Sequence, residues 1–107
     1  MELTRLEQGG TPVYALAGKC TVEHAAALRQ ALLEAVSVNT VLTLDVSGVE
    51  EADITFLQLL LATALTLEQN GGSLRRHGPV SPAALAAARV AGFSHTPKLA
   101  NFFSDED

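Results

Sequence analysis

The fold of this chain is decided by residues 41–61, which read VLTLDVSGVEEADITFLQLLL. The first six residues are largely apolar and β-branched, a composition typical of a buried strand, and the following Ser47-Gly48 predicts a turn. From Asp53 onward apolar residues recur at helical spacing, so we expect a helix over residues 53–70. A buried strand followed by a helix predicts an α/β fold, with this strand in the middle of a sheet.

The segments on either side extend this unit. Asn70, Gly71 and Gly72 are residue types that end helices, and residues 73–77 predict a short strand that lies parallel to the first. Before the unit, residues 1–7 and 11–17 are joined by two glycines, a pattern that favours a hairpin. These segments predict a mixed sheet, in which some neighbouring strands pair antiparallel and others pair parallel.

Two further helices are predicted from their end signals. Thr21 is a good N-cap residue, so we expect a first helix from Thr21 to Val36. Ser81-Pro82 predicts the start of a third helix, which Gly92 ends. The tail then carries a group of large apolar side chains, and we expect a last short helix there that packs back on the sheet. Those side chains are Leu99, Phe102 and Phe103.

Length and charge exclude several classes of protein. The chain of 107 residues fits a single domain, 1–107, and its 7 Lys and Arg against 12 Asp and Glu give a net charge of −5. This charge has the wrong sign for nucleic acid or anionic lipid. The longest apolar block, residues 56–67, is too short to span a membrane. We expect no nucleic-acid partner and no direct membrane insertion, and the single cysteine, Cys20, suits the reducing cytoplasm.

Catalytic and metal chemistry find little support. His24, His77 and His95 fall on different elements and lack the spacing of a metal pair. Cys20 fits the role of a small apolar residue at a strand end better than that of a nucleophile. No set of nucleophile, base and orienting group stands out, so we expect a protein that is not an enzyme and binds no metal and no cofactor.

One basic cluster leaves two interpretations open. Arg75, Arg76 and His77 are adjacent in the sequence and fall in the predicted second strand of the central unit. They fit a solvated edge strand, or a contact for a phosphate or an acidic partner.

The start of the central helix is the candidate functional site. Asp53 is expected to be the N-cap, and the unpaired N–H groups of the first turn favour an oxygen acceptor or an added phosphate. Thr55 lies at the same strand-to-helix corner, where a kinase could reach its hydroxyl. Thr55 is therefore the candidate phosphoacceptor.

The same helix is apolar over more than half of its circumference. One sheet face cannot cover such an arc, so either the first or the third helix covers the excess or part of it stays exposed for a partner. In the second case the exposed residues are Leu61 and Leu65, which border Gln58 and Gln69.

With these elements in place, the chain resembles the STAS domain, the sulphate transporter and anti-sigma-factor antagonist family. The resemblance is most specific over residues 44–49, at Asp53 and Thr55, and over residues 57–61. Gly78-Pro79 before a helix, and a helix that ends at Gly92-Phe93, are also similar to that family. The fold that the resemblance implies is a mixed sheet of four to five strands with helices packed mainly on one side.

The resemblance also implies a function. In the antagonist branch an Asp precedes two small hydroxyl residues and a Gly, and the second hydroxyl accepts phosphate from a serine kinase that is also the anti-sigma factor. By position Asp53 matches the Asp and Thr55 the acceptor, while Ile54 replaces the first hydroxyl and Phe56 the Gly. This departure resembles stand-alone bacterial STAS proteins found beside chemotaxis and two-component genes. The implied partner is a serine kinase or anti-sigma factor, or a chemotaxis-type histidine kinase.

From these patterns we expect a signalling module that acts by partner switching. The candidate partner-binding residues lie at the helix start and along its outer side: Asp53, Ile54, Phe56, Gln58, Leu61 and Leu65. The alternative is a STAS subunit of a phospholipid-transport ABC system, a branch that places Thr directly after the Asp, where this chain has Ile54. The sequence leaves open whether the chain forms a homodimer.

Overall fold

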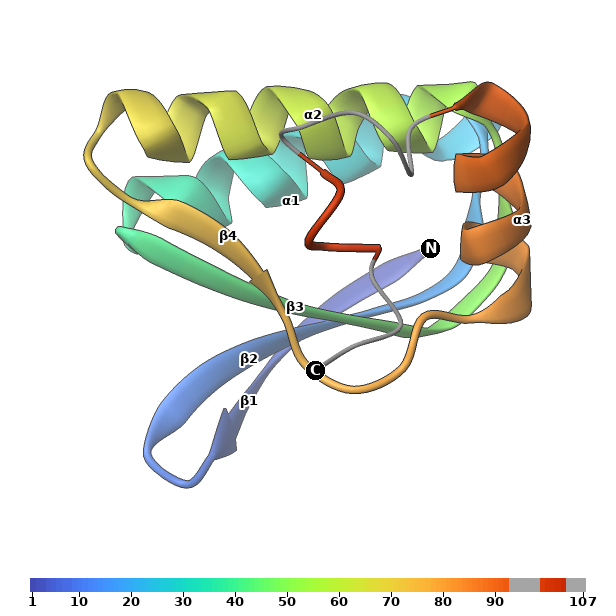
Figure 1. Ribbon diagram of the computed structural model, residues 1–107. Coiled ribbons are helices and arrows are strands. Elements are labelled where there is room, and N and C mark those ends of the chain that lie inside the picture. Colours follow the sequence, from blue (N-terminus) through green and yellow to red (C-terminus); the bar gives the residue numbers. More distant parts are fainter. Residues whose placement is uncertain (93–98, 104–107) are drawn as a thin grey trace.

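The computed structural model describes residues 1–92 and 99–103, in which four strands and three α-helices form an α/β fold (Figure 1). In chain order the elements are β1 (Glu2–Gln8), β2 (Thr11–Cys20), the 3-10 helix η1 (Val22–His24), α1 (Ala25–Ser37), β3 (Val41–Ala52), α2 (Ile54–Gln69), β4 (Ser73–Arg76) and α3 (Pro82–Ala91).

The four strands form one mixed sheet in the order β1-β2-β3-β4. β1 pairs with β2 antiparallel, whereas β2 with β3 and β3 with β4 pair parallel. α1 and α2 lie side by side over one face of the sheet, and α3 packs at the end where β3 runs into α2 (Figure 1). The prediction of a mixed sheet with helices mainly on one side is confirmed.

The core lies between that face of the sheet and the helices. Every second residue of β3 from Leu42 to Val46 is fully buried, as the alternation of a strand requires. α2 contributes buried residues from several turns because it lies along the sheet over its whole length: Phe56, Leu57, Leu60, Ala64 and Leu67.

The ends of α2 and α3 follow the sequence signals. Gly71 adopts a left-handed φ of 79°, and the N–H of Gly72 donates to the carbonyl of Leu67 at 2.7 Å, which ends α2 in a Schellman-type turn. Ser81 Oγ accepts from the N–H of Ala84 at 3.1 Å at the start of α3, and Gly92 ends that helix with a φ of 76°. The predicted caps of both helices are confirmed.

The turn predicted at Ser47-Gly48 is wrong, because β3 continues through it to Ala52. The pairing between β2 and β3 shifts register here, between Ala15 and Ala17. A Cβ at Gly48 would lie 3.1 Å from the Cβ of Ala17 and 3.3 Å from the carbonyl oxygen of Leu16. Gly48 therefore permits a close approach of the two strands at an irregularity rather than a reversal of the chain.

The first helix starts differently from the prediction. Residues 22–24 form a 3-10 turn, and the α-helix begins only at Ala25. Thr21 makes no side-chain cap hydrogen bond within the part of the chain that the structure describes. The N–H of Val22 instead donates to the carboxylate of Asp53 at 2.9 Å, so a residue from another element supplies the cap.

The described tail, residues 99–103, forms turns and not the predicted short helix. Its one helix-like hydrogen bond runs from the N–H of Phe103 to the carbonyl of Leu99 at 3.1 Å. The packing prediction holds, because Leu99, Phe102 and Phe103 are buried in the main core. The two phenylalanine rings meet edge to face, with 5.1 Å between their centroids.

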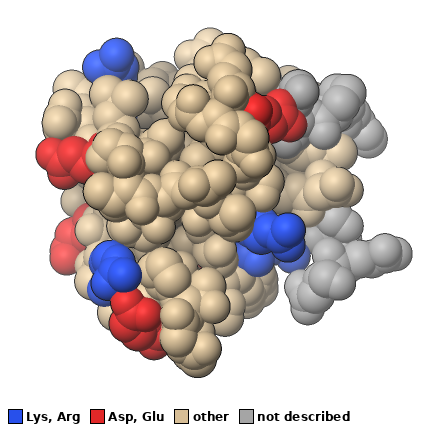
Figure 2. Space-filling view, turned by 90° about the vertical axis from the view of Figure 1, so that its left-hand side faces the viewer, with Lys and Arg blue, Asp and Glu red and all other residues tan. Residues whose placement is uncertain are grey.

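The surface offers no large field of one charge on the face that Figure 2 shows. Acidic and basic side chains lie at scattered positions around a mostly uncharged centre (Figure 2). Among the described residues, no helix combines the length and the apolar character that crossing a membrane would require.

Candidate functional site

Asp53 occupies the N-cap of α2. Its backbone is extended, with φ −136° and ψ −172°, and its Oδ1 accepts from the N–H groups of Thr55 at 3.0 Å and Phe56 at 3.3 Å. These bonds satisfy two of the N–H groups that the first turn of a helix leaves unpaired. The predicted N-cap role of Asp53 is confirmed.

The second oxygen of the same carboxylate reaches a different segment. Asp53 Oδ2 accepts from the N–H of Val22, 31 positions earlier in the sequence, at 2.9 Å. Asp53 thus holds the start of η1 against the start of α2. The sequence did not show this link, since it depends on the parallel pairing that brings the ends of β2 and β3 together.

Thr55, the candidate phosphoacceptor, is the second residue of α2 and is half-buried. Its neighbours differ sharply in exposure. Ile54 is 54% exposed, whereas Phe56 is 1% exposed and belongs to the core. The prediction that Phe56 is a partner contact is therefore wrong, because its place on the helix directs the ring between α2 and the sheet.

The other predicted contacts on α2 fall together on one side of the helix. Ile54, Gln58, Leu61 and Leu65 have i, i+4, i+7, i+11 spacing, which places them along one stripe. Ile54, Gln58 and Leu65 are exposed, and Leu61 is half-buried against the core. We call these four residues the outer stripe.

α1 covers part of the remaining apolar arc of α2. A groove of about 180 Å³ between the two helices is lined by Leu32, Leu33 and Val36 of α1 and by Leu59 and Ala62 of α2, among others. α1 therefore lies beside Leu59, as the first interpretation expected. Leu65 remains 38% exposed, and its contact with a partner stays a prediction.

A larger groove lies beside the start of α2, and sequence reasoning missed it. Its volume is about 710 Å³, and α3 forms one wall while the end of β3, the start of α2 and Thr21 form the other. The α3 wall is made of small or exposed apolar side chains: Ala83, Ala86, Ala87, Val90 and Ala91. These residues repeat at helical spacing on a side of α3 that borders buried Ala84 and Ala88, with Ala87 and Ala91 packed partly against the core, and that pattern was a readable signal.

The opposite side of this groove, which we call the α3 groove, is acidic. Glu50 and Glu51 at the end of β3 line it together with Asp53 and Ile54. Glu51 pairs with Lys19 at 3.5 Å, and both side chains of that pair are more than half exposed. Exposed pairs of this kind are weak, so the wall keeps its acidic character.

Cys20 also lies close to this corner, and it is buried, with 1% exposure. Burial raises the pKa of the Cys20 thiol to about 11, the positive N-terminus lowers it, and the Asp53 carboxylate adds to the increase. The thiol is therefore protonated at neutral pH and a poor nucleophile.

No group of three or more His, Cys, Asp or Glu that could hold a metal occurs in residues 1–92 and 99–103. His24 and His77 lie on separate elements, η1 and the residue after β4. His95 falls outside the described residues.

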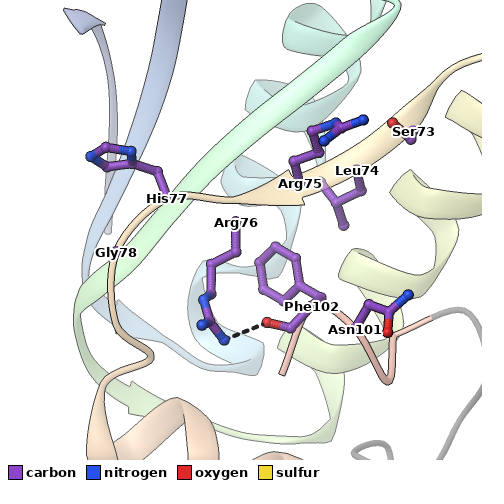
Figure 3. Close-up of a pocket in the computed structure, with 8 residues that line it drawn as sticks. All are labelled: Ser73, Leu74, Arg75, Arg76, His77, Gly78, Asn101 and Phe102. Carbon is purple, nitrogen blue, oxygen red and sulfur yellow. Dashed lines mark hydrogen bonds between the residues drawn. The ribbon is translucent and has the colours of Figure 1, made fainter. Parts of the chain in front are cut away.

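The basic cluster Arg75, Arg76 and His77 borders another groove, of about 570 Å³, between β4 and the tail (Figure 3). The three side chains do not converge. Arg76 turns towards the tail and donates from Nη1 to the carbonyl of Phe102 at 2.7 Å, while Arg75 and His77 point away from Phe102. The alternating directions of an edge strand thus divide the cluster between two faces.

Comparisons with known proteins agree with this geometry. A family model described as "Mlab, STAS domain" matches residues 4–100. The crystal structure of an anti-sigma factor antagonist from Mycobacterium paratuberculosis is similar at 25% identity and a TM-score of 0.68, over 89% of this chain and 80% of that chain.

A crystal structure of Mglu is similar in fold alone, at 19% identity and a TM-score of 0.55, and the match covers 71% of this chain and 19% of that one. Among curated proteins, no sequence match was found. The family match extends over nearly the whole chain, and the mixed α/β fold observed here is similar to that of the anti-sigma factor antagonist. The chain therefore belongs to the STAS domain family.

Proposed function

We propose that this STAS domain is a non-catalytic signalling module of the cytoplasm that docks a protein partner at the start of α2. Its structural likeness to an anti-sigma factor antagonist supports a protein partner. The observation that carries the proposal is that Asp53 and Ile54, the two residues before Thr55, line an open groove with two exposed apolar side chains, Ile54 and Val90.

Exposed apolar side chains beside a groove are typical of a binding surface. Val90 is 90% exposed and Ile54 54% exposed, on opposite walls of the α3 groove. The partner is a serine kinase or anti-sigma factor, or a chemotaxis-type histidine kinase. Its contact surface covers Ile54 and the exposed members of the outer stripe.

Phosphorylation of Thr55 would control this docking. A phosphate adds about −1.5 to −2 charges at neutral pH. It would stand beside Asp53 and near Glu50 and Glu51, so the partner would face a more strongly acidic surface. A partner that binds the unmodified chain by apolar contact would then have to desolvate the phosphate, and we expect affinity to fall.

The direct test uses the kinase encoded next to this protein. The chain and its Thr55→Ala variant are incubated with that kinase and ATP, and the intact masses are measured. We expect one phosphate on the natural chain and none on the variant. Phosphate at another residue, or no phosphate at all, would show that Thr55 is not the switch.

A second candidate is a permanent STAS subunit of a phospholipid-transport ABC complex. The apolar wall of the α3 groove favours it, because permanent interfaces are more apolar than transient ones. Ile54 argues against it, since that branch is expected to carry Thr there. Purification of the tagged chain from its own cells separates the two: an ATPase retained in high salt supports the transport subunit, whereas a kinase released on phosphorylation supports switching.

A further inference from the structure

One carboxylate connects the candidate phosphoacceptor to the wall of the α3 groove. Asp53 Oδ1 accepts from the N–H groups of Thr55 and Phe56, and Asp53 Oδ2 accepts from the N–H of Val22. Val22 follows Thr21, which lines the groove. The two oxygens belong to one rigid planar group, so a rotation that removes Oδ1 from α2 also removes Oδ2 from Val22.

We propose that Asp53 transmits phosphorylation of Thr55 to the α3 groove by releasing Val22. This inference rests on the proposed function, because it takes Thr55 as the residue that is modified. In that step Oγ1 of Thr55 forms a bond to the γ-phosphorus of ATP, the bond from that phosphorus to ADP breaks, and the hydroxyl proton leaves to a base of the kinase.

The phosphate and the Asp53 carboxylate compete for the same donors. A phosphoryl group on Thr55 carries three strong acceptor oxygens. These oxygens compete with Asp53 Oδ1 for the N–H groups of Thr55 itself and of the next residue, Phe56. It also places a second negative group beside the carboxylate at a half-buried corner, where like charges repel more strongly than in water. Rotation of the Asp53 side chain away from α2 relieves both conflicts.

The segment that Asp53 holds has little else to hold it. η1 buries none of its residues, and Val22 is 66% exposed. Its other backbone hydrogen bonds that the structure describes are local to the turn: the N–H of His24 donates to the carbonyl of Thr21 at 2.9 Å, and the N–H of Ala25 donates to the carbonyl of Val22. Loss of the Asp53 bond therefore frees residues 21–24 to move, and the groove wall that contains Thr21 moves with them.

Amide hydrogen exchange of Val22, followed by NMR, tests this link without any partner. The chain is made with phosphothreonine at position 55, with Thr55→Gln as a neutral control of similar bulk. We expect exchange at Val22 to be about tenfold faster or more in the phosphorylated chain, as for a lost hydrogen bond to a charged group, and unchanged in the control. Amides in β3 should show no difference.

Asp53→Asn provides the matched variant. Its amide oxygen still caps α2, but an NH₂ group faces Val22, so Val22 should already exchange faster without phosphate. Phosphothreonine added to this variant should then change the exchange rate of Val22 little. Two changes that act through the same hydrogen bond are expected to be non-additive in this way. Equal acceleration by phosphate in both backgrounds would overturn the role of Asp53.

The exchange result is independent of whether a kinase uses Thr55. If phosphate weakens partner binding while Val22 exchanges at its original rate, the proposed function holds and the link through Asp53 is wrong. If Val22 is released but no partner responds to the phosphate, the link holds and the proposed function is wrong.

Discussion

Gly72 passes against the carbonyl group of Thr40, so close that a Cβ on Gly72 would overlap both the carbon and the oxygen of that group. The same carbonyl accepts from the N–H of Ser73 at 3.2 Å, the first bond that joins β4 to the start of β3. The contact fixes where the chain leaves α2 and enters the sheet, and it leaves no room for a side chain.

Gly72→Ala should therefore be strongly destabilising, by about 3 kcal/mol or more, since backbone on both sides must move. Gly71→Ala is the matched control: no atom lies within 4 Å of its Cβ, and its cost comes from the left-handed φ of 79°. We expect about 1 to 2 kcal/mol there. Urea unfolding of both variants checks the order, and equal losses would show that the contact with Thr40 is unimportant.

Asp53→Ala should lower the free energy of unfolding by about 2 kcal/mol, because it removes a helix cap and the acceptor of Val22. Asp53→Asn should cost less, since Asn is an equally good N-cap and retains the bonds to α2. Thermal or urea melts of the two variants measure the difference. A loss of similar size in both would contradict the division of the two oxygens between α2 and η1.

Phe56→Ala and Ile54→Ala should separate stability from binding. Phe56 is 1% exposed, and its truncation should cost about 3 to 5 kcal/mol. Ile54 is 54% exposed, so Ile54→Ala should lower the free energy of unfolding by less than about 1 kcal/mol but weaken partner binding. We expect the same of Val90→Ala. Titration calorimetry at a temperature where each variant is folded gives the affinities. Unchanged binding by the Ile54 and Val90 variants would remove the α3 groove from the docking surface.

Thr55→Glu should leave the fold intact. A negative charge in the first turn of a helix stabilises it by roughly 0.3 to 1 kcal/mol, although here it also faces Asp53. Thr55→Glu should weaken partner binding, because its carboxylate must be desolvated, whereas Thr55→Ala should bind almost as the natural chain does. Melting curves and partner titrations measured together distinguish an interface effect from unfolding. Equal affinity of Thr55→Glu and the natural chain would place the docking surface elsewhere.

Stability should fall as the pH rises from about 9 to 11. Burial raises the pKa of Cys20 from 9.0 to about 11, so the unfolded chain loses this proton at a lower pH than the folded chain. Below pH 9 the thiol keeps its proton in both states, so its contribution to the free energy of unfolding does not change with pH. Between pH 9 and about 11 the thiol ionises only in the unfolded state, and this ionisation stabilises the unfolded state. Cys20→Ala should lack this part of the decline. Parallel curves for both proteins would contradict the burial of an unionised thiol.

Much of the fold was readable because the signals were local. Asp53, Ser81-Pro82 and Gly92 mark helix ends through their own chemistry, and the glycines at 9 and 10 allow the hairpin that joins β1 to β2. The turn predicted at Ser47-Gly48 was wrong because strand pairing overrides the local turn signal. β2 runs beside β3 at this point, and the missing side chain of Gly48 lets the two strands approach closely. Long-range pairing decides such a residue, and the sequence carries no direct record of it.

The candidate site divides in the same way. The N-cap role of Asp53 follows from position alone, but the bond to Val22 requires knowing that β2 and β3 end side by side. Phe56 was misplaced for a simpler reason. Residues two positions apart on a helix point about 200° apart, so exposed Ile54 and buried Phe56 can both belong to one short motif.

The order of the strands has a consequence for how the chain folds. After β1, each strand pairs with the one that precedes it in the sequence, so no pairing has to wait for a strand that comes later in the chain. The sheet can therefore assemble in steps as the polypeptide emerges from the ribosome. The final step has to wait, because Leu99, Phe102 and Phe103 are buried in the same core as β3 and α2. A nascent chain stalled before Phe103 is clear of the exit tunnel should hold a formed sheet with an open hydrophobic edge, and chaperones would recognise it.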